Sequence, residues 1–347
     1  MYKKALLLLF PLFFSCSTDL DLTAEWKEIT IVYGLLNPTD SAHYVKISKA
    51  FLDESTDALT IAQRGDSLFH QQALVVALEE WKDGSKLATY PLSKVDGVDE
   101  GFTKEPGTFA ASPNILFKTK APLNTAIGYT YLLTISNTHD GKDLKAETPI
   151  VGKISNLLPN KIIPLNWASK GDYNFSWRSA ENGKIYDLTV RIHWTEFDVN
   201  TGLPLDTGYW DWAVVRSLKS ESTDGGVGMS YKVPAKNLYY FVRTQLTPDP
   251  DVYRVVDSFG LYFYVGEAQL STYIDVVNAQ LGLTQTQIKP AYTNVENGLG
   301  IFSSRYDTVI TGIPFTNAAL DSFGCGTITG HLNFAPSKSH PNWPFCQ

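Results

Sequence analysis

The amino-acid sequence predicts a mainly β protein built from two antiparallel β-sandwich modules of the immunoglobulin or fibronectin type III kind. Aromatic residues make up 13% of the 347 residues and charged residues only 19%. With many Thr, Val and Ile residues besides, this composition favours strands over helices. Short alternating apolar and polar segments recur between turn sequences, which is typical of sandwiches. A chain of this length is expected to form about two domains.

The first segment, residues 1–15, is expected to be an export signal. Lys3 and Lys4 precede an apolar run from Ala5 to Phe14. The run has about half of the roughly 20 residues that a membrane-spanning helix needs. A positive flank followed by a short apolar run is the pattern of a secretory signal, which is removed and takes no part in the fold.

Cys16 stands where the apolar run ends, at the position where a bacterial lipoprotein is cleaved and lipidated. Ser15 is small, as cleavage requires, whereas Phe13 and Phe14 depart from the usual lipobox. We expect lipid on Cys16 and a tether over residues 16–25. Several acyl chains on one cysteine would hold the protein on a membrane. The alternative is ordinary cleavage beside a neighbouring serine, which would release a soluble protein.

The first sandwich is expected over residues 26–152. Alternation is clearest over residues 29–35, 74–81 and 129–135. Asp83-Gly84 is the dipeptide of a tight hairpin turn. The regular spacing of these strands predicts a small antiparallel sandwich.

The second sandwich is expected over residues 153–347, with a long strand that starts near residue 185. One face of this strand carries Tyr186, Leu188, Val190, Ile192 and Trp194, and the other carries Asp187, Thr189, Arg191 and His193. One face is therefore buried and the other solvated. Residues 209–218, 238–246 and 252–265 are expected to add strands, and the apolar run at 262–264 to be covered on both sides.

A single convincing helix is expected near residues 267–281. Leu270, Ile274, Val277 and Leu281 fall on one helical face, and Gly282 is placed to end the helix. We expect this face to cover an apolar surface of the second module.

Cys325 and Cys346 remain as a pair once Cys16 carries lipid. In an exported protein this count predicts a disulfide, which closes a loop of about 20 residues and stabilises by roughly 3 kcal/mol. His331 and His340 lie between the two cysteines, so a zinc site is the alternative. Its spacings are wider than those of the usual paired ligands.

Motifs that would name an enzyme are missing from the sequence: it has no H-E-x-x-H, G-x-S-x-G, phosphate loop or C-x-x-C. Glu79 and Glu80 are adjacent in a strand and point to opposite faces. The calcium-loop pattern that starts at Asp198 fails at its twelfth position, Tyr209. We therefore expect no enzyme, cofactor or bound metal. The net charge of −7 argues against nucleic acid as a partner.

Trp210 and Trp212 lie on the same side of an extended segment. Exposed, they would be stacking platforms for a glycan. The plainer interpretation is that they fill the core.

The run N-V-E-N-G-L-G-I-F-S-S-R, residues 294–305, resembles the glycine-phenylalanine block of a family of Bacteroidetes outer-membrane lipoproteins with a domain of unknown function. The late cysteine pair and the lipobox at Cys16 resemble those of the same family, whereas Ser303-Ser304 departs from its commoner glycine and alanine. Members are often associated with TonB-dependent transporters. No catalytic residues are known for the family, so the resemblance carries none over.

These observations favour a lipid-anchored outer-membrane protein, on the periplasmic or the cell-surface face, that acts as a non-enzymatic binding or assembly partner. A TonB-dependent transporter is the partner that the resemblance implies. A glycan-binding module is the first alternative. The second is a hydrolase whose acid/base pair assembles only in the fold.

Overall fold

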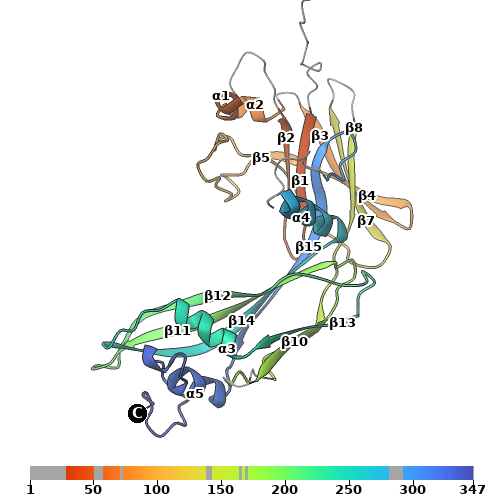
Figure 1. Cartoon of the computed structure of the whole chain (residues 1–347). Helices are drawn as coiled ribbons and strands as arrows, with labels where there is room; N and C mark the ends of the chain where they lie inside the picture. The colour runs from red at the N-terminus through yellow and green to blue at the C-terminus, as the bar shows by residue number, and fades with distance from the viewer. Residues whose placement is uncertain are drawn as a thin grey trace, which may run out of the picture.

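The computed structural model describes residues 29–50, 58–70, 73–137, 143–163, 166–168, 171–280 and 292–346. The expected signal, Cys16 and the tether lie outside this part. The described chain is mainly β, with several antiparallel sheets, as predicted. Figure 1 shows two units, one above the other, joined by long strands. None of the helices in the described residues is long and apolar enough to cross a membrane.

The strands that precede the junction are β1 (Ile29–Leu36), β2 (His43–Ala50), β3 (Leu74–Lys82), β4 (Ser85–Pro91), β5 (Ser93–Asp96), β6 (Ile115–Thr119), β7 (Tyr129–Asn137) and β8 (Asp143–Pro149). The later strands are β9 (Ser155–Leu158), β10 (Asp172–Arg178), β11 (Ile185–Asp198), β12 (Pro204–Lys219), β13 (Gly228–Pro234), β14 (Val252–Gly266) and β15 (Leu299–Ile313). The helices are α1 (Ala58–Ala62), α2 (Gly65–Leu68), α3 (Lys236–Thr244), α4 (Ala268–Gln280) and α5 (Asn317–Cys325), followed by a 3₁₀ turn (Gly330–Leu332).

The first unit is a pair of sheets with a shared core. One sheet has the order β4-β3-β7-β8, and the facing sheet contributes β15, β1, β2, β6 and β5. Val32 and Phe302 from the second sheet pack in one cluster with Leu78 and Leu133 from the first. The alternating pattern of these strands explains the burial, because every second side chain points inward. The specific immunoglobulin or fibronectin topology stays a prediction.

Strand β15 belongs to both units. This differs from the expected division at residue 152, which assigns the whole strand to the second module. Its first half runs parallel to β1, from the Ile31–Leu299 pair to the Leu36–Ser304 pair. Its second half is antiparallel to β14, from Gly266–Arg305 to Phe259–Ile313. Residues 299–304, expected in the second module, are therefore a strand of the first. Parallel pairing between distant segments leaves no local turn signal that would predict it.

The second unit packs one long sheet, β12-β11-β14-β15, against a small sheet, β13-β10-β9. Helices α3 and α5 lie on the same side as the small sheet (Figure 1). Large aromatic side chains fill the core between these layers: Trp167, Trp177, Tyr239, Phe259 and Phe323.

Residues 238–246, expected to be a strand, form most of helix α3 instead. Leu238, Tyr239 and Val242 are its buried residues. They recur at the three- and four-residue spacings of a helical face, although the β propensity of the aromatic run suggests a strand.

Candidate binding face and junction

Trp210 and Trp212 point into the core and are not exposed platforms, contrary to the glycan-stacking hypothesis. Trp210 is 9% exposed and stacks on Trp194 with ring centroids 5.3 Å apart. Trp212 lies 5.4 Å from Trp167 and stacks on Phe241 at 5.9 Å. Because side chains alternate along a strand, the residues that β12 presents to solvent are the neighbours of the two tryptophans.

One of these neighbours, Tyr209, is part of an ordered stack on the outer face of the long sheet. The guanidinium carbon of Arg191 lies 3.8 Å from the ring centroid of Tyr209 and 4.4 Å from that of Tyr262. Arg191 also donates two hydrogen bonds to the carboxylate of Asp211, both at 2.7 Å. The bidentate pair raises the pKa of Arg191. Side chains from three adjacent strands therefore hold one another in place.

The outer face continues toward the first unit with more aromatic and paired charged groups. Tyr264 follows Tyr262 on the same face of β14 and is 43% exposed, so the expected cover on both sides of this run is wrong here. Arg216 pairs with Asp187 at 3.2 Å. On the other side of the stack, the ring of His193 lies 6.1 Å from that of Tyr209, on the solvated face as predicted.

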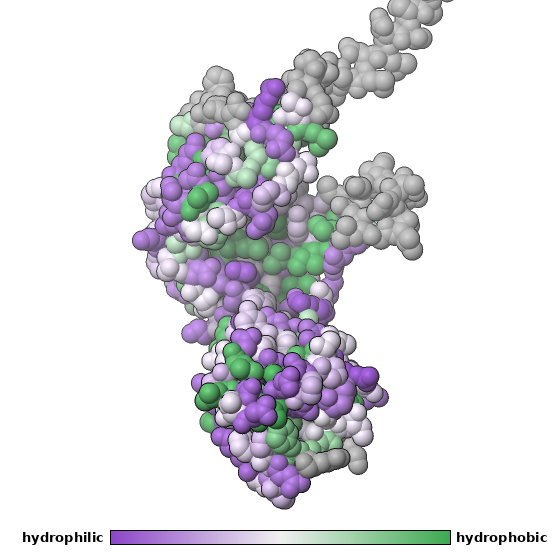
Figure 2. Space-filling view, turned by 90° about the vertical axis from the view of Figure 1, so that its left-hand side faces the viewer, coloured by the Kyte–Doolittle hydropathy of each residue, from purple (hydrophilic) through white to green (hydrophobic). Residues whose placement is uncertain are grey.

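A hydrophobic recess lies where the two units meet, on either side of α4. One groove, of about 380 Å³, is lined by Leu35, Tyr264, Leu270 and Ile274 among others. A second groove, of about 520 Å³, shares Leu35 and Leu270 and adds Tyr33. Figure 2, which looks onto this side, shows hydrophobic side chains gathered in a hollow at mid-height of the molecule. The recess leaves α4 only half covered.

Helix α4 begins at a buried carboxylate that fixes it to β15. The carboxylate oxygen Oε2 of Glu267 accepts hydrogen bonds from the Gln269 backbone N–H at 2.7 Å and from the Ser303 hydroxyl at 2.9 Å. Asn294 donates to the side chain of Gln269 and to the Phe302 carbonyl. The expected helix is present, but its apolar face covers the junction, where β1 and β15 lie, and not the second unit alone.

Burial raises the pKa of Glu267, although these hydrogen bonds oppose the shift. The folded protein then binds this proton at a higher pH than the unfolded chain does. We expect the contribution of Glu267 to the free energy of unfolding to rise as pH falls from the raised pKa toward the ordinary value of about 4.3. Glu267→Gln should remove this dependence, which denaturant unfolding between pH 4 and 8 measures.

Glu267→Ala should instead lose the hydrogen bond that caps α4, which lowers the free energy of unfolding by about 1 kcal/mol at every pH. The assignment would be contradicted if the free energy of unfolding fell from pH 4 to pH 8 by the same amount in the wild type and in Glu267→Gln.

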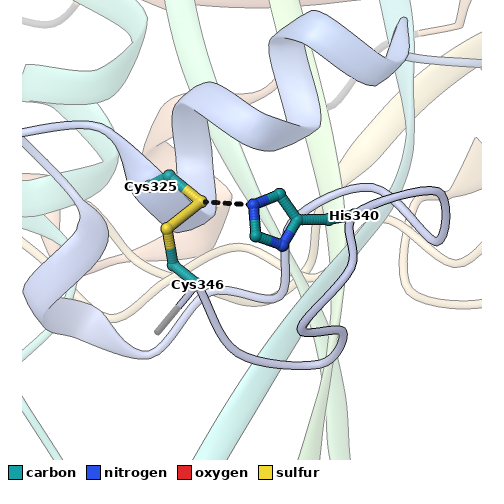
Figure 3. A group of neighbouring side chains, drawn as sticks. All are labelled: Cys325, His340 and Cys346. Carbon is teal, nitrogen blue, oxygen red and sulfur yellow. Dashed lines mark hydrogen bonds between the residues drawn. A yellow bond between two sulfur atoms is a disulfide. The ribbon is translucent and has the colours of Figure 1, made fainter.

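The cysteine pair forms a disulfide in the C-terminal segment, as the cysteine count predicts. The Cα atoms of Cys325 and Cys346 are 5.3 Å apart, and His340 Nε2 lies 3.8 Å from Cys325 Sγ (Figure 3). Within the described residues, these three form the one group of three potential metal ligands, with donor atoms within 4.8 Å of one another. Both sulfur atoms are bonded to each other, so in this form they do not provide the thiolates of the zinc alternative.

Comparison with protein-family models and with curated proteins found no match to this chain. The resemblance to the Bacteroidetes lipoproteins therefore stays a prediction. The site residues on the outer face, Arg191, Tyr209, Tyr262 and Tyr264, are not identified as a site by the sequence. The sequence indicates only that one side of β11 is solvated. It does not indicate the stack, because the stack depends on the register between three strands.

Proposed function

We propose that this protein is a lipid-anchored protein of the outer membrane that binds and helps to assemble a membrane partner, of which a TonB-dependent transporter is the best candidate. The anchor is Cys16. The binding surface is the recess around α4. The role is non-enzymatic, and the glycan-binding and hydrolase alternatives for the whole protein rank below it.

The exposed apolar lining of the recess is the observation that supports this proposal best. Tyr33 is 45% and Leu35 38% exposed, and both point outward from β1 beside α4. Arg305 and Asp187 border the apolar lining. Aromatic and aliphatic side chains with a polar border are characteristic of protein-interaction surfaces. A lipid anchor would raise the effective concentration of the protein near a membrane partner, so a recess of this size would suffice for association.

A photo-crosslinking amino acid at position 33 tests the recess directly. We expect irradiated cells to give a discrete adduct with an integral outer-membrane protein. The same amino acid at Tyr231, which is 37% exposed on β13, is the matched control and should give none. Equal adducts at the two positions, or an adduct at position 33 only between copies of this chain, would refute the proposed partner.

Replacing Cys16 by alanine tests the anchor. We expect the variant to move from the membrane pellet to the soluble fraction almost completely, because stable attachment requires the acyl chains. Fractionation and mass spectrometry of the mature N-terminus measure this, with Ser17→Ala as the control that keeps the lipid. A wild-type N-terminus without lipid would disprove the anchor whatever the crosslinking shows.

A further inference from the structure

The outer face of the long sheet in the second unit has a composition different from that of the recess. It combines exposed tyrosines with charged groups that are already paired across neighbouring strands. Arg191 is matched by Asp211, and Arg216 by Asp187. The face therefore offers flat apolar rings and many hydrogen-bonding atoms, with little uncompensated charge.

We propose that Tyr209, Arg191, Tyr262 and Tyr264 form a binding site for a neutral carbohydrate chain. A sugar ring has an apolar face of C–H groups, which packs on an aromatic ring, and an edge of hydroxyl groups, which both donate and accept hydrogen bonds. Tyr209 is 53% and Tyr264 43% exposed, so each ring has surface free for such packing. The hydroxyl groups of the tyrosines, and the lone pairs of Asp211 that Arg191 leaves free, can form hydrogen bonds with the sugar edge.

The stack is already ordered before any ligand binds. Arg191 lies between the rings of Tyr209 and Tyr262 and is fixed by two hydrogen bonds to Asp211. Its Nη1 also donates to the Tyr262 hydroxyl at 3.3 Å. Binding to rings held in this way loses little side-chain entropy, which favours affinity for a ligand of small contact area.

The spacing of the rings favours a chain over a single sugar. Tyr262 and Tyr264 lie on the same face of one strand, about 6.8 Å apart at the usual rise. Tyr209 lies two strands away from them, across β11, which is about 9.5 Å at the usual strand separation. It is also offset along the sheet, because it pairs with His193, four residues from Thr189, the partner of Tyr262. A ligand that contacts all three rings must span several sugar units.

The paired charges select against an anionic ligand. A phosphate or uronate needs an arginine with free N–H groups in a fork, and the fork of Arg191 is engaged by Asp211 at 2.7 Å. Displacing Asp211 would leave its carboxylate beside the anion. Neutral hydroxyl groups meet no such repulsion, so we assign the neutral class.

Calorimetry on the detergent-solubilised lipoprotein tests the assignment, with cello-, xylo-, manno- and maltohexaose as neutral probes and hexagalacturonate as the anionic probe. We expect at least one neutral hexasaccharide to bind, with little change between about 50 and 500 mM salt. Tyr209→Ala and Tyr264→Ala should each weaken its Kd about five- to tenfold. Tyr240→Ala, 47% exposed on α3, should leave the Kd unchanged, and the exposed positions keep all three variants folded.

Three results would overturn the assignment: no binding of any neutral hexasaccharide, binding that survives both tyrosine variants, or preferential, salt-sensitive binding of hexagalacturonate. None of them bears on crosslinking from position 33, because Tyr33 lines the second groove of the recess, whereas Tyr264 lines only the first. The ligand assignment and the proposed membrane partner can therefore fail separately.

Discussion

The Gly300→Ala variant is expected to lose roughly 3 kcal/mol or more of its free energy of unfolding. Gly300 has a φ of +107°, a conformation that residues with a Cβ rarely adopt. A Cβ there would lie 2.0 Å from the carbonyl oxygen of Val32 and 2.9 Å from its carbonyl carbon. Both contacts are to the backbone of β1, which pairs with β15 at this residue. A side-chain rotation cannot relieve them, so the two strands would have to move apart.

Gly312→Ala is the matched control, because it tests conformation without the clash. Gly312 lies on the same strand with a φ of +68°, and a Cβ added there would have no atom within 4 Å. Its replacement should lower the free energy of unfolding by only about 1–2 kcal/mol. Denaturant unfolding followed by tryptophan fluorescence compares the two. If Gly300→Ala is no less stable than Gly312→Ala, the parallel pairing of β1 and β15 is wrong.

The position of Gly300 gives this prediction its importance for the whole molecule. The residue lies in the half of β15 that completes the first unit, just before the half that enters the second. Phe302, two residues on, is fully buried in the core of the first unit. The glycine-phenylalanine block of the sequence is therefore part of the strand that belongs to both units.

Local periodicity is enough to predict the faces of β11 from the sequence. Leu188, Val190 and Ile192 are fully buried, and Arg191 and His193 lie on the solvated side. A period of two residues in a strand fixes which side chains share a face, without any knowledge of the partners. The disulfide could be predicted in the same way: if the chain is exported and Cys16 carries lipid, as expected, Cys325 and Cys346 allow a single pairing.

What could not be predicted depends on contacts between distant segments. The pairing of Leu299 with Ile31 joins residues separated by most of the chain. Likewise, Arg191 meets Tyr209 only because β11 and β12 pair in one register. The two-residue period of a strand shows that the two tryptophans of β12 share a face. Only the packing of the sheets shows that this face is the inner one. The register between strands thus decides which side chains meet on the proposed binding face, and this register cannot be derived from one sequence.

Arg254→Ala is expected to lower the free energy of unfolding by about 3–5 kcal/mol. The Arg254 side chain is 5% exposed, and its Nε donates to Glu196 Oε1 at 2.7 Å. Its Nη1 donates to the carbonyl oxygen of Leu332 at 2.8 Å. Removing the guanidinium leaves the half-buried Glu196 carboxylate without its partner and the Leu332 carbonyl without a donor. Denaturant unfolding at neutral pH measures the loss.

Arg216→Ala is the matched control for a surface ion pair. Arg216 is 63% exposed in its pair with Asp187, and exposed pairs contribute about 0.5 kcal/mol. Each variant removes one arginine side chain from the same sheet. The difference between their losses of unfolding free energy therefore isolates the effect of burial. Comparable losses would mean that the Arg254 environment is as well solvated as the surface.

The backbone of Arg254 shows why this pair matters to the C-terminal segment. Its N–H donates to the Asn333 carbonyl at 2.8 Å, and its carbonyl accepts from the Ala335 N–H at 2.8 Å. Side chain and backbone together bind the segment between Cys325 and Cys346 to β14. A double variant, Arg254→Met with Glu196→Gln, distinguishes the ion pair from simple packing. If the unpaired charge dominates, the double variant should be more stable than Arg254→Met alone; additive losses would assign the effect to packing.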